Sequence, residues 1–132
     1  MRWASLASAR VTAVLGHEAE EVAAALSGLD VVMTVNPDFA EGQRASVHHG
    51  FVNAGEADSY MVTPADLPRL TPADCCALIA SHAAATDGAV TVPMRFGQDG
   101  AERGNPLMLS GTARDDVIAG GINLGCRGLL DR

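Results

Sequence analysis

Short apolar runs that alternate with helical patterns constrain the fold of this chain more than any other sequence feature. The runs are free of charged residues and occupy residues 11–15, 31–35, 59–63, 89–93 and 106–109. They are almost continuously apolar, which is typical of strands buried on both faces of a parallel sheet. The alternation predicts right-handed β-α-β crossovers and an α/β fold with a doubly wound, mostly parallel sheet.

The segments between these runs predict helices over residues 17–27, 43–54, 71–84 and 112–119. The helix at 71–84 is the best marked, because Thr71 suits the N-cap, Pro72 suits the first helical position and Asp74 completes a pattern resembling a capping box. Residues 94–105 are rich in glycine and charge, so we expect an exposed hairpin or loop there.

A chain of 132 residues fits one domain and can bury a real core. We expect that core to contain apolar residues of the predicted strands and of the third helix. They are Val14, Val32, Val35, Met61, Val62, Leu78, Ile79 and Val92.

Composition excludes several classes of protein. With 48% hydrophobic and 19% charged residues, the chain is not a disordered one. A net charge of −7 argues against nucleic acid as a partner, and the apolar runs are shorter than the roughly 20 residues of a membrane-spanning helix. Cys75, Cys76 and Cys126 lack C-x-x-C spacing, so reduced thiols in a cytoplasmic protein are the simplest account.

Asp66 is the best-marked candidate for chemistry. It follows an apolar strand and lies between Pro64 and Pro68 in the sequence TPADLP, which fixes the turn and directs the carboxylate beyond the strand end. A carboxylate held in this way suits Mg²⁺, which takes oxygen ligands and shares them with substrate phosphates. The alternative is a turn aspartate that caps its own backbone.

Other polar groups carry weaker signals. The strand-end turn 36–42, with Asp38 and Glu41, has ordinary turn chemistry, while the helix start at 42–46 has the groups to hold an anion or a ribose. His48 and His49 are adjacent, so on a helix they point about 100° apart and do not suit one metal ion. We expect solvated or capping histidines.

Five collinear segments resemble the MobA/MocA-like nucleotidyltransferases of molybdenum cofactor maturation. VTAVLGHEAEEV (11–22) is similar to the family's second strand and following helix, and NPDFAEGQRASVHHG (36–50) to its N-P-x-[WF]-x-x-G…S-[LV]-x-x-G segment. MVTPADLPR (61–69) resembles its G-D-M-P-R turn, RGNPL (103–107) its R-G-[HN]-P-[VL] motif, and NLGCRGLL (123–130) its D-x-G-A-R-x-L-L segment.

The resemblance implies a Rossmann-like fold and Mg²⁺-dependent transfer of CMP or GMP from CTP or GTP onto molybdopterin, with loss of pyrophosphate. Catalysis in such a family consists mainly of positioning and of neutralising phosphate charge. By position, Asp66 takes the place of the Mg²⁺ ligand in the G-D-M-P turn. Asn123 takes the place of the second acidic ligand.

The same resemblance assigns the small-molecule contacts. Arg44 and Ser46 fall in the segment near the nucleotide, and Gly104, Asn105 and Pro106 would shape the pocket for a molybdopterin-like acceptor. Ligands of open α/β sheets gather at the carboxyl ends of the strands. We therefore expect Ser46 and Asn105 to converge there with the two metal ligands.

Departures from the family pattern have implications of their own. The chain lacks the glycine-rich L-A-A-G-x-S-x-R-x-G loop and a downstream Lys, carries Asn123 in place of Asp, and has Ala65 before Asp66 in place of Gly. The resemblance therefore implies an N-terminally truncated domain without the first strand and phosphate loop, inactive as an isolated chain. Either the two flanking strands pair directly, or a homodimer or a complementing N-terminal fragment supplies the missing strand.

Three origins fit these departures: a truncated or mis-started reading frame, one part of a split enzyme, or a degenerate domain. The alternative to nucleotidyl transfer is a non-catalytic binding or interaction domain.

Overall fold

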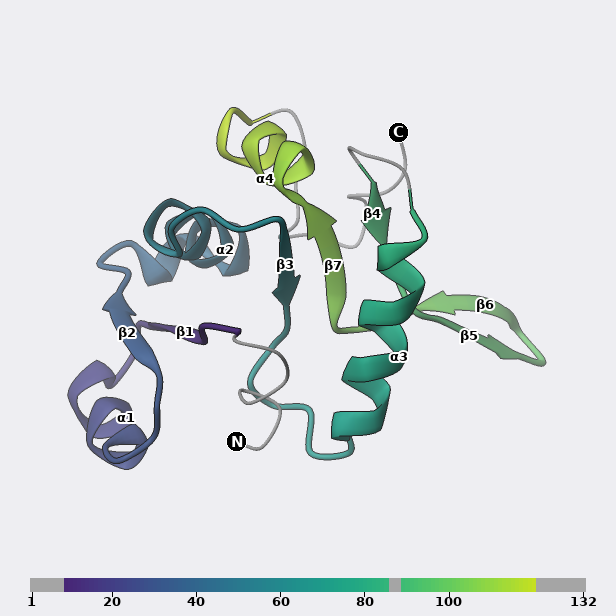
Figure 1. The fold of residues 1–132 in the computed structure, drawn as a ribbon. Helices are drawn as coiled ribbons and strands as arrows, with labels where there is room; N and C mark the ends of the chain where they lie inside the picture. The colour runs from purple at the N-terminus through teal and green to yellow at the C-terminus, as the bar shows by residue number, and fades with distance from the viewer. Residues whose placement is uncertain (1–8, 86–88, 121–132) are drawn as a thin grey trace. The chain divides into compact units, whose positions relative to one another are not determined.

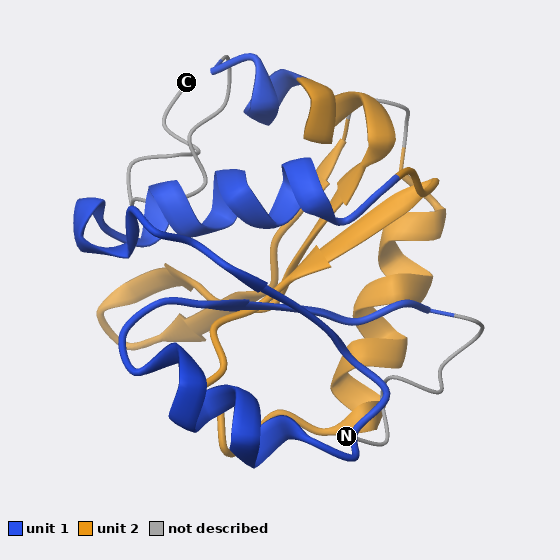
Figure 2. Cartoon of the chain, turned by 90° about the vertical axis from the view of Figure 1, so that its left-hand side faces the viewer, with its two compact units in different colours: residues 1–55, 116–132 blue, residues 56–115 orange. Residues whose placement is uncertain are grey.

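A computed structural model describes residues 9–85 and 89–120 of the chain. Its residues group into two compact units, coloured separately in Figure 2. Unit 1 comprises residues 1–55 and 116–132, and unit 2 comprises residues 56–115, so that the division falls within the last described helix. We describe each unit by itself.

Unit 1 is built on a parallel pair of strands. β1 (Thr12–Leu15) is followed by α1 (Ala19–Leu26), β2 (Val32–Val35), a 3₁₀ turn (Phe39–Glu41) and α2 (Gln43–Asn53). β1 and β2 pair with Thr12 opposite Val32 and Leu15 opposite Val35. α2 packs on β1 so closely that a Cβ at Gly50 would lie 2.9 Å from Cγ2 of Val14.

Unit 2 is built around an antiparallel strand. Its order is β3 (Ser59–Val62), α3 (Pro72–Ala83), β4 (Val90–Thr91), β5 (Met94–Gly97), β6 (Gly100–Arg103), β7 (Leu107–Ser110) and the first part of α4 (Gly111–Ile118). Figure 1 shows β7 between β3 and β4, antiparallel to both, with α3 packed alongside. β5 and β6 form a separate antiparallel hairpin.

The predicted elements are present, with shifted ends. Each of the five predicted strands and four predicted helices matches a described element, although the strand predicted at 89–93 shrinks to Val90–Thr91. The exposed hairpin or loop predicted at 94–105 is a hairpin formed by β5 and β6, whose residues are all exposed. Among the described residues, no helix is long and apolar enough to cross a membrane.

The pairing confirms an α/β fold with a small parallel sheet, but it does not confirm a doubly wound, mostly parallel one. β7 runs antiparallel to both of its neighbours. The reason lies in the connection: β4 leads to β7 through the β5–β6 hairpin, and a parallel neighbour would need a crossover, usually a helix.

The core differs from the predicted one. Of the eight predicted residues, only Leu78 is buried, whereas Val14, Met61, Val62 and Val92 are half-buried. The prediction was wrong for Val32 (48% exposed), Val35 (53%) and Ile79 (40%). The apolar run at 31–35 predicts a strand buried on both faces, but among the described residues β2 has a strand neighbour on one edge only.

Buried apolar residues are instead distributed between the two units. In unit 1 they are Leu15, Phe51 and Val117. In unit 2 they are Tyr60, Cys75, Leu78, Met108, Leu109 and Ala113. The α3 members, together with the buried His82, follow a helical spacing of three and four residues, so one face of α3 covers β7 and β4.

Candidate functional site

The turn that follows β2 in unit 1 is organised by Asn36, which is 2% exposed. Its backbone N–H donates to the carbonyl of Leu15 at 2.8 Å, which ties the end of β2 to the end of β1. Its side-chain Oδ1 accepts from the backbone N–H of Asp38 at 3.0 Å, a bond typical of an Asx turn. Its Nδ2 donates to Oγ of Ser46 at 3.2 Å.

A second polar contact lies beside this one. Oγ1 of Thr34 and Nε2 of His49 are 2.8 Å apart. Thr34 and Asn36 lie two residues apart and Ser46 and His49 three apart, so both contacts join the strand segment to one side of α2. Hydrogen bonds as well as packing therefore fix the start of α2.

A cavity of about 760 Å³ opens beside this turn. Its lining comes from the turn after β2, from α2 and from residues 117–120, all within unit 1. Arg44, His48 and His49 supply its basic groups, and Asp38 and Glu41 its carboxylates. Ser46 is not part of the lining.

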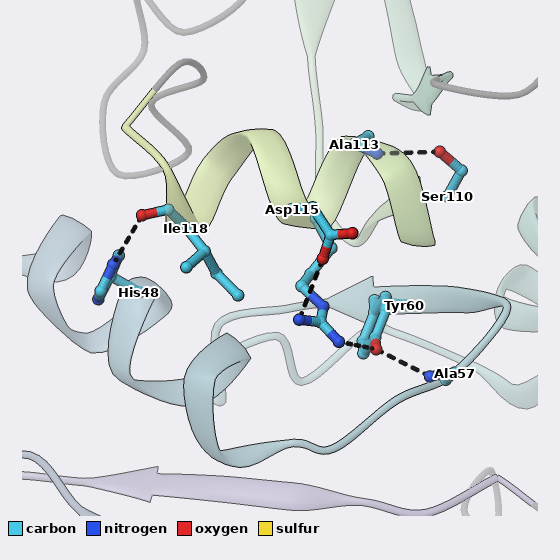
Figure 3. A network of polar contacts seen from close by, with 8 residues as sticks. His48, Ala57, Tyr60, Ser110, Ala113, Asp115 and Ile118 are labelled. Carbon is cyan, nitrogen blue, oxygen red and sulfur yellow. Dashed lines mark hydrogen bonds and ion pairs between the residues drawn. The ribbon is translucent and has the colours of Figure 1, made fainter.

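The histidines behave largely as predicted. Nε2 of His48 is 3.2 Å from the carbonyl oxygen of Ile118, the last residue of α4, as Figure 3 shows. This contact confirms a capping histidine, and His17 is exposed. His82 differs: it is 7% exposed, with Nδ1 2.8 Å from Oγ1 of Thr91, because α3 turns it toward β4.

The loop between β3 and α3 in unit 2 holds Asp66. The side chain is exposed, and its carboxylate makes no hydrogen bond or ion pair within the described part of the chain. The alternative of an aspartate that caps its own backbone is therefore not found. The carboxylate oxygens are available to a ligand.

A capping box anchors the far end of the Asp66 loop. Oγ1 of Thr71 accepts from the N–H of Asp74 at 3.1 Å, and the Asp74 carboxylate accepts from the N–H of Thr71 at 3.0 Å. The bond from the Thr71 backbone, followed by the bond with its side chain, holds the pKa of Asp74 below its ordinary value. This confirms the helix start predicted at 71–84.

Residues 104–106 connect β6 to β7, also in unit 2. The N–H of Gly104 donates to the carbonyl of Pro93 at 2.8 Å, and a Cβ there would lie 3.5 Å from that oxygen, an ordinary contact. Asn105 is exposed, whereas Pro106 is buried. Asn105 is therefore exposed to solvent between Gly104, which is hydrogen-bonded, and Pro106, which is buried.

Sequence reasoning missed a polar network in unit 2. Nη2 of Arg114 donates to the Tyr60 hydroxyl at 2.8 Å, and the guanidinium lies 5.0 Å from the centroid of that ring. The hydroxyl also accepts from the N–H of Ala57 at 2.8 Å (Figure 3). The hydrogen bond to Tyr60 is the main cause that raises the pKa of Arg114. No local pattern links residues this far apart in sequence.

The arrangement of carboxylates limits which metal ions this chain could bind. Among the described residues, no group of three or more His, Cys, Asp or Glu side chains is placed to hold a metal ion. A single unpaired carboxylate such as Asp66 still fits Mg²⁺, which commonly takes one or two protein carboxylates together with substrate phosphates. Asn123 lies outside the described residues.

The family of the MobA-like NTP transferase domain matches residues 2–131. The chain therefore belongs to the MobA-like NTP transferase family. A comparison with curated proteins finds no match.

Proposed function

We propose that this domain binds CTP or GTP with Mg²⁺, for transfer of CMP or GMP to a molybdopterin-like acceptor. The observation that carries the proposal is the Asp66 carboxylate, exposed at a strand end and without a partner among the described residues. The family match over residues 2–131 supports it, because the match includes the segment around Asp66.

Asp66 would hold the metal, with Asn123 as the second ligand. Bound Mg²⁺ neutralises the charge of the transferred phosphate. Pro64 and Pro68 restrict the backbone on either side of Asp66, which reduces the backbone entropy lost on binding. The sheet we propose around it is the Rossmann-like, doubly wound one that the family resemblance implies.

The remaining roles divide between the two units. Arg44 and Ser46 would contact the nucleotide, each from its own side of the start of α2. The acceptor pocket would be shaped by Gly104, Asn105 and Pro106. Of these three residues, Asn105 is exposed and offers a side-chain amide. The cytoplasmic location predicted from the reduced cysteines stays a prediction.

We propose further that the 132-residue chain binds nucleotide weakly and does not turn it over. Its sequence contains no glycine-rich phosphate loop and no lysine to follow one. Preorganised phosphate contacts each supply several kcal/mol of transition-state stabilisation, on the order of 3 kcal/mol for one donor. Loss of several such contacts reduces transfer far more than it reduces binding.

Isothermal titration of the full chain with CTP and with GTP, with and without Mg²⁺, tests this function. Wild type should show weak binding that depends on Mg²⁺, and Asp66→Ala should lose it. Asp99→Ala, which removes an exposed carboxylate from the turn between β5 and β6, is the matched control and should keep it.

Two outcomes would contradict the proposal. Equal Mg²⁺-dependent binding in wild type and Asp66→Ala would remove Asp66 from the site. Pyrophosphate release at ordinary enzyme rates, with CTP or GTP, Mg²⁺ and molybdopterin, would overturn the expected inactivity.

A further inference from the structure

The orientation of the Asn36 side-chain amide is fixed by its neighbours. A backbone N–H needs an acceptor, so the end of the amide that meets the N–H of Asp38 at 3.0 Å must be the oxygen. The other end, which meets Oγ of Ser46 at 3.2 Å, must then be the NH₂ group. Asn36 therefore donates to Ser46 and cannot accept from it.

This direction decides what Ser46 can do. A serine hydroxyl has one hydrogen to donate and lone pairs to accept with, and here a lone pair is taken by Asn36. The hydroxyl hydrogen has no acceptor among the described residues. Ser46 as a residue is half-buried rather than fully buried.

We propose that Asn36 is a positioning residue that makes Ser46 a hydrogen-bond donor to an acceptor oxygen of the bound nucleotide. This inference rests on the proposed nucleotide-binding function and assigns the polarity of one contact within it. The acceptor is a phosphate, ribose or base oxygen, since all three accept from a hydroxyl.

The surroundings make the arrangement rigid. Asn36 is 2% exposed, so water does not compete for its amide, and its backbone is bonded to Leu15. The contact between Thr34 and His49 holds α2 one turn further along. A donor that is oriented before the ligand arrives loses little entropy on binding.

Reversal of the bond direction tests the inference. In Asn36→Asp, the introduced carboxylate still accepts from the N–H of Asp38 but can only accept from Ser46, so the hydroxyl hydrogen turns inward. CTP or GTP, whichever wild type binds, should bind about tenfold more weakly to Asn36→Asp and to Ser46→Ala. Ser46→Thr, which keeps a hydroxyl, should stay close to wild type.

The double variant separates positioning from structural or charge effects. In the Ser46→Ala background, Asn36→Asp should cause less than about a twofold further loss. A structural role, or repulsion between the new carboxylate and the phosphates, would cause the same loss in both backgrounds and would overturn the inference. Asn53→Asp adds the same charge at the other end of α2, where Asn53 bonds to the carbonyl of His49, and should leave affinity unchanged.

Ligand fragments identify the acceptor. If Ser46→Ala weakens CTP and inorganic tripolyphosphate but not cytidine, the acceptor is a phosphate oxygen. If it weakens CTP and cytidine but not tripolyphosphate, the acceptor belongs to the ribose or base. Wild type that binds no nucleotide overturns the proposed function and the inference together, whereas wild-type binding insensitive to Ser46→Ala overturns the inference alone.

A spectroscopic readout covers the case in which Asn36→Asp does not fold. In the wild-type protein, one NH₂ proton of Asn36 should show the NMR shift of a hydrogen-bonded amide, and Ser46→Ala should move it. An Asn36 NH₂ resonance unchanged by Ser46→Ala would contradict the bond on which the inference depends.

Discussion

Two strand-end turns of this chain look alike in sequence and differ in structure. The turn after β2 begins with Asn36-Pro37 and the loop after β3 with Thr63-Pro64, and each contains an aspartate. In the first, the Asn36 side chain makes two hydrogen bonds and is almost completely buried. In the second, Asp66 is exposed and without a partner among the described residues.

The difference between the two turns distinguishes polar groups that stabilise the fold from polar groups that are free to bind a ligand. Polar atoms that are used to hold the backbone stabilise the fold, and only a leftover donor such as the Ser46 hydroxyl remains for a ligand. Polar atoms that hold nothing contribute little to stability and stay free to bind. Substitutions in the first turn should therefore lower stability, and substitution of Asp66 should lower only binding.

The largest stability effect should come from Gly16, next to the first turn. A Cβ at this position would lie 2.5 Å from Cβ of Phe39, an atom that no rotamer change can move. Gly16→Ala should lower the free energy of unfolding by about 3 kcal/mol, measured by urea denaturation. Gly97→Ala, where a Cβ meets nothing within 4 Å, is the control and should stay within about 0.5 kcal/mol.

Asn36→Ala should follow, with a loss of about 2 kcal/mol, because it removes a buried amide that makes hydrogen bonds to the N–H of Asp38 and to Ser46. Asp66→Ala should change the free energy of unfolding by less than about 0.5 kcal/mol, since an exposed, unpaired side chain is removed. Equal losses in these two variants would break the comparison between the two turns.

The capping box at the end of the Asp66 loop gives a smaller effect. Thr71→Ala removes the acceptor for the N–H of Asp74 and should cost about 1 kcal/mol. Thr71→Ser keeps a hydroxyl and should recover most of the loss. A Thr71→Ala protein as stable as wild type would show that the loop is not anchored there.

The smallest effect concerns pH. The fold holds the pKa of Asp74 below its ordinary value of 3.8, so its stabilising contribution is present above that value. The contribution is lost as pH falls through the lowered pKa. Asp74→Asn should therefore flatten the loss of stability below about pH 4, measured by urea midpoints, while Asp99→Asn should not. If the stability of wild type and of Asp74→Asn fell equally with pH, the lowered pKa of Asp74 would be contradicted.

Local signals predicted the elements well. Thr71, Pro72 and Asp74 specify a helix start within three residues of sequence, and the structure contains that start. Asp66 could be singled out as an exposed carboxylate after a strand because its prolines and its strand lie close to it in the chain. The family itself was predictable from segments such as NPDFAEG, each of which is short and contiguous.

Features that depend on distant partners were not predictable. The antiparallel direction of β7 depends on which strands it pairs with, and the exposure of Val32 and Val35 depends on what neighbours β2 has. Arg114 and Tyr60 meet across 54 residues of sequence. Asn36 could have been found, because Asn-Pro favours a turn and an Asn side chain there commonly accepts from the backbone N–H two residues on.

The central proposal is that Asp66 and Ser46 each take part in nucleotide binding. NMR shift mapping of the isotope-labelled full chain, titrated with CTP and with GTP in Mg²⁺, tests it most directly. The account predicts changes at the backbone amides of Asp66 and Ser46 and at the Asn36 side-chain amide, absent for Asp66 when Mg²⁺ is omitted. Changes confined to the β5–β6 hairpin, or no changes with either nucleotide, would contradict it.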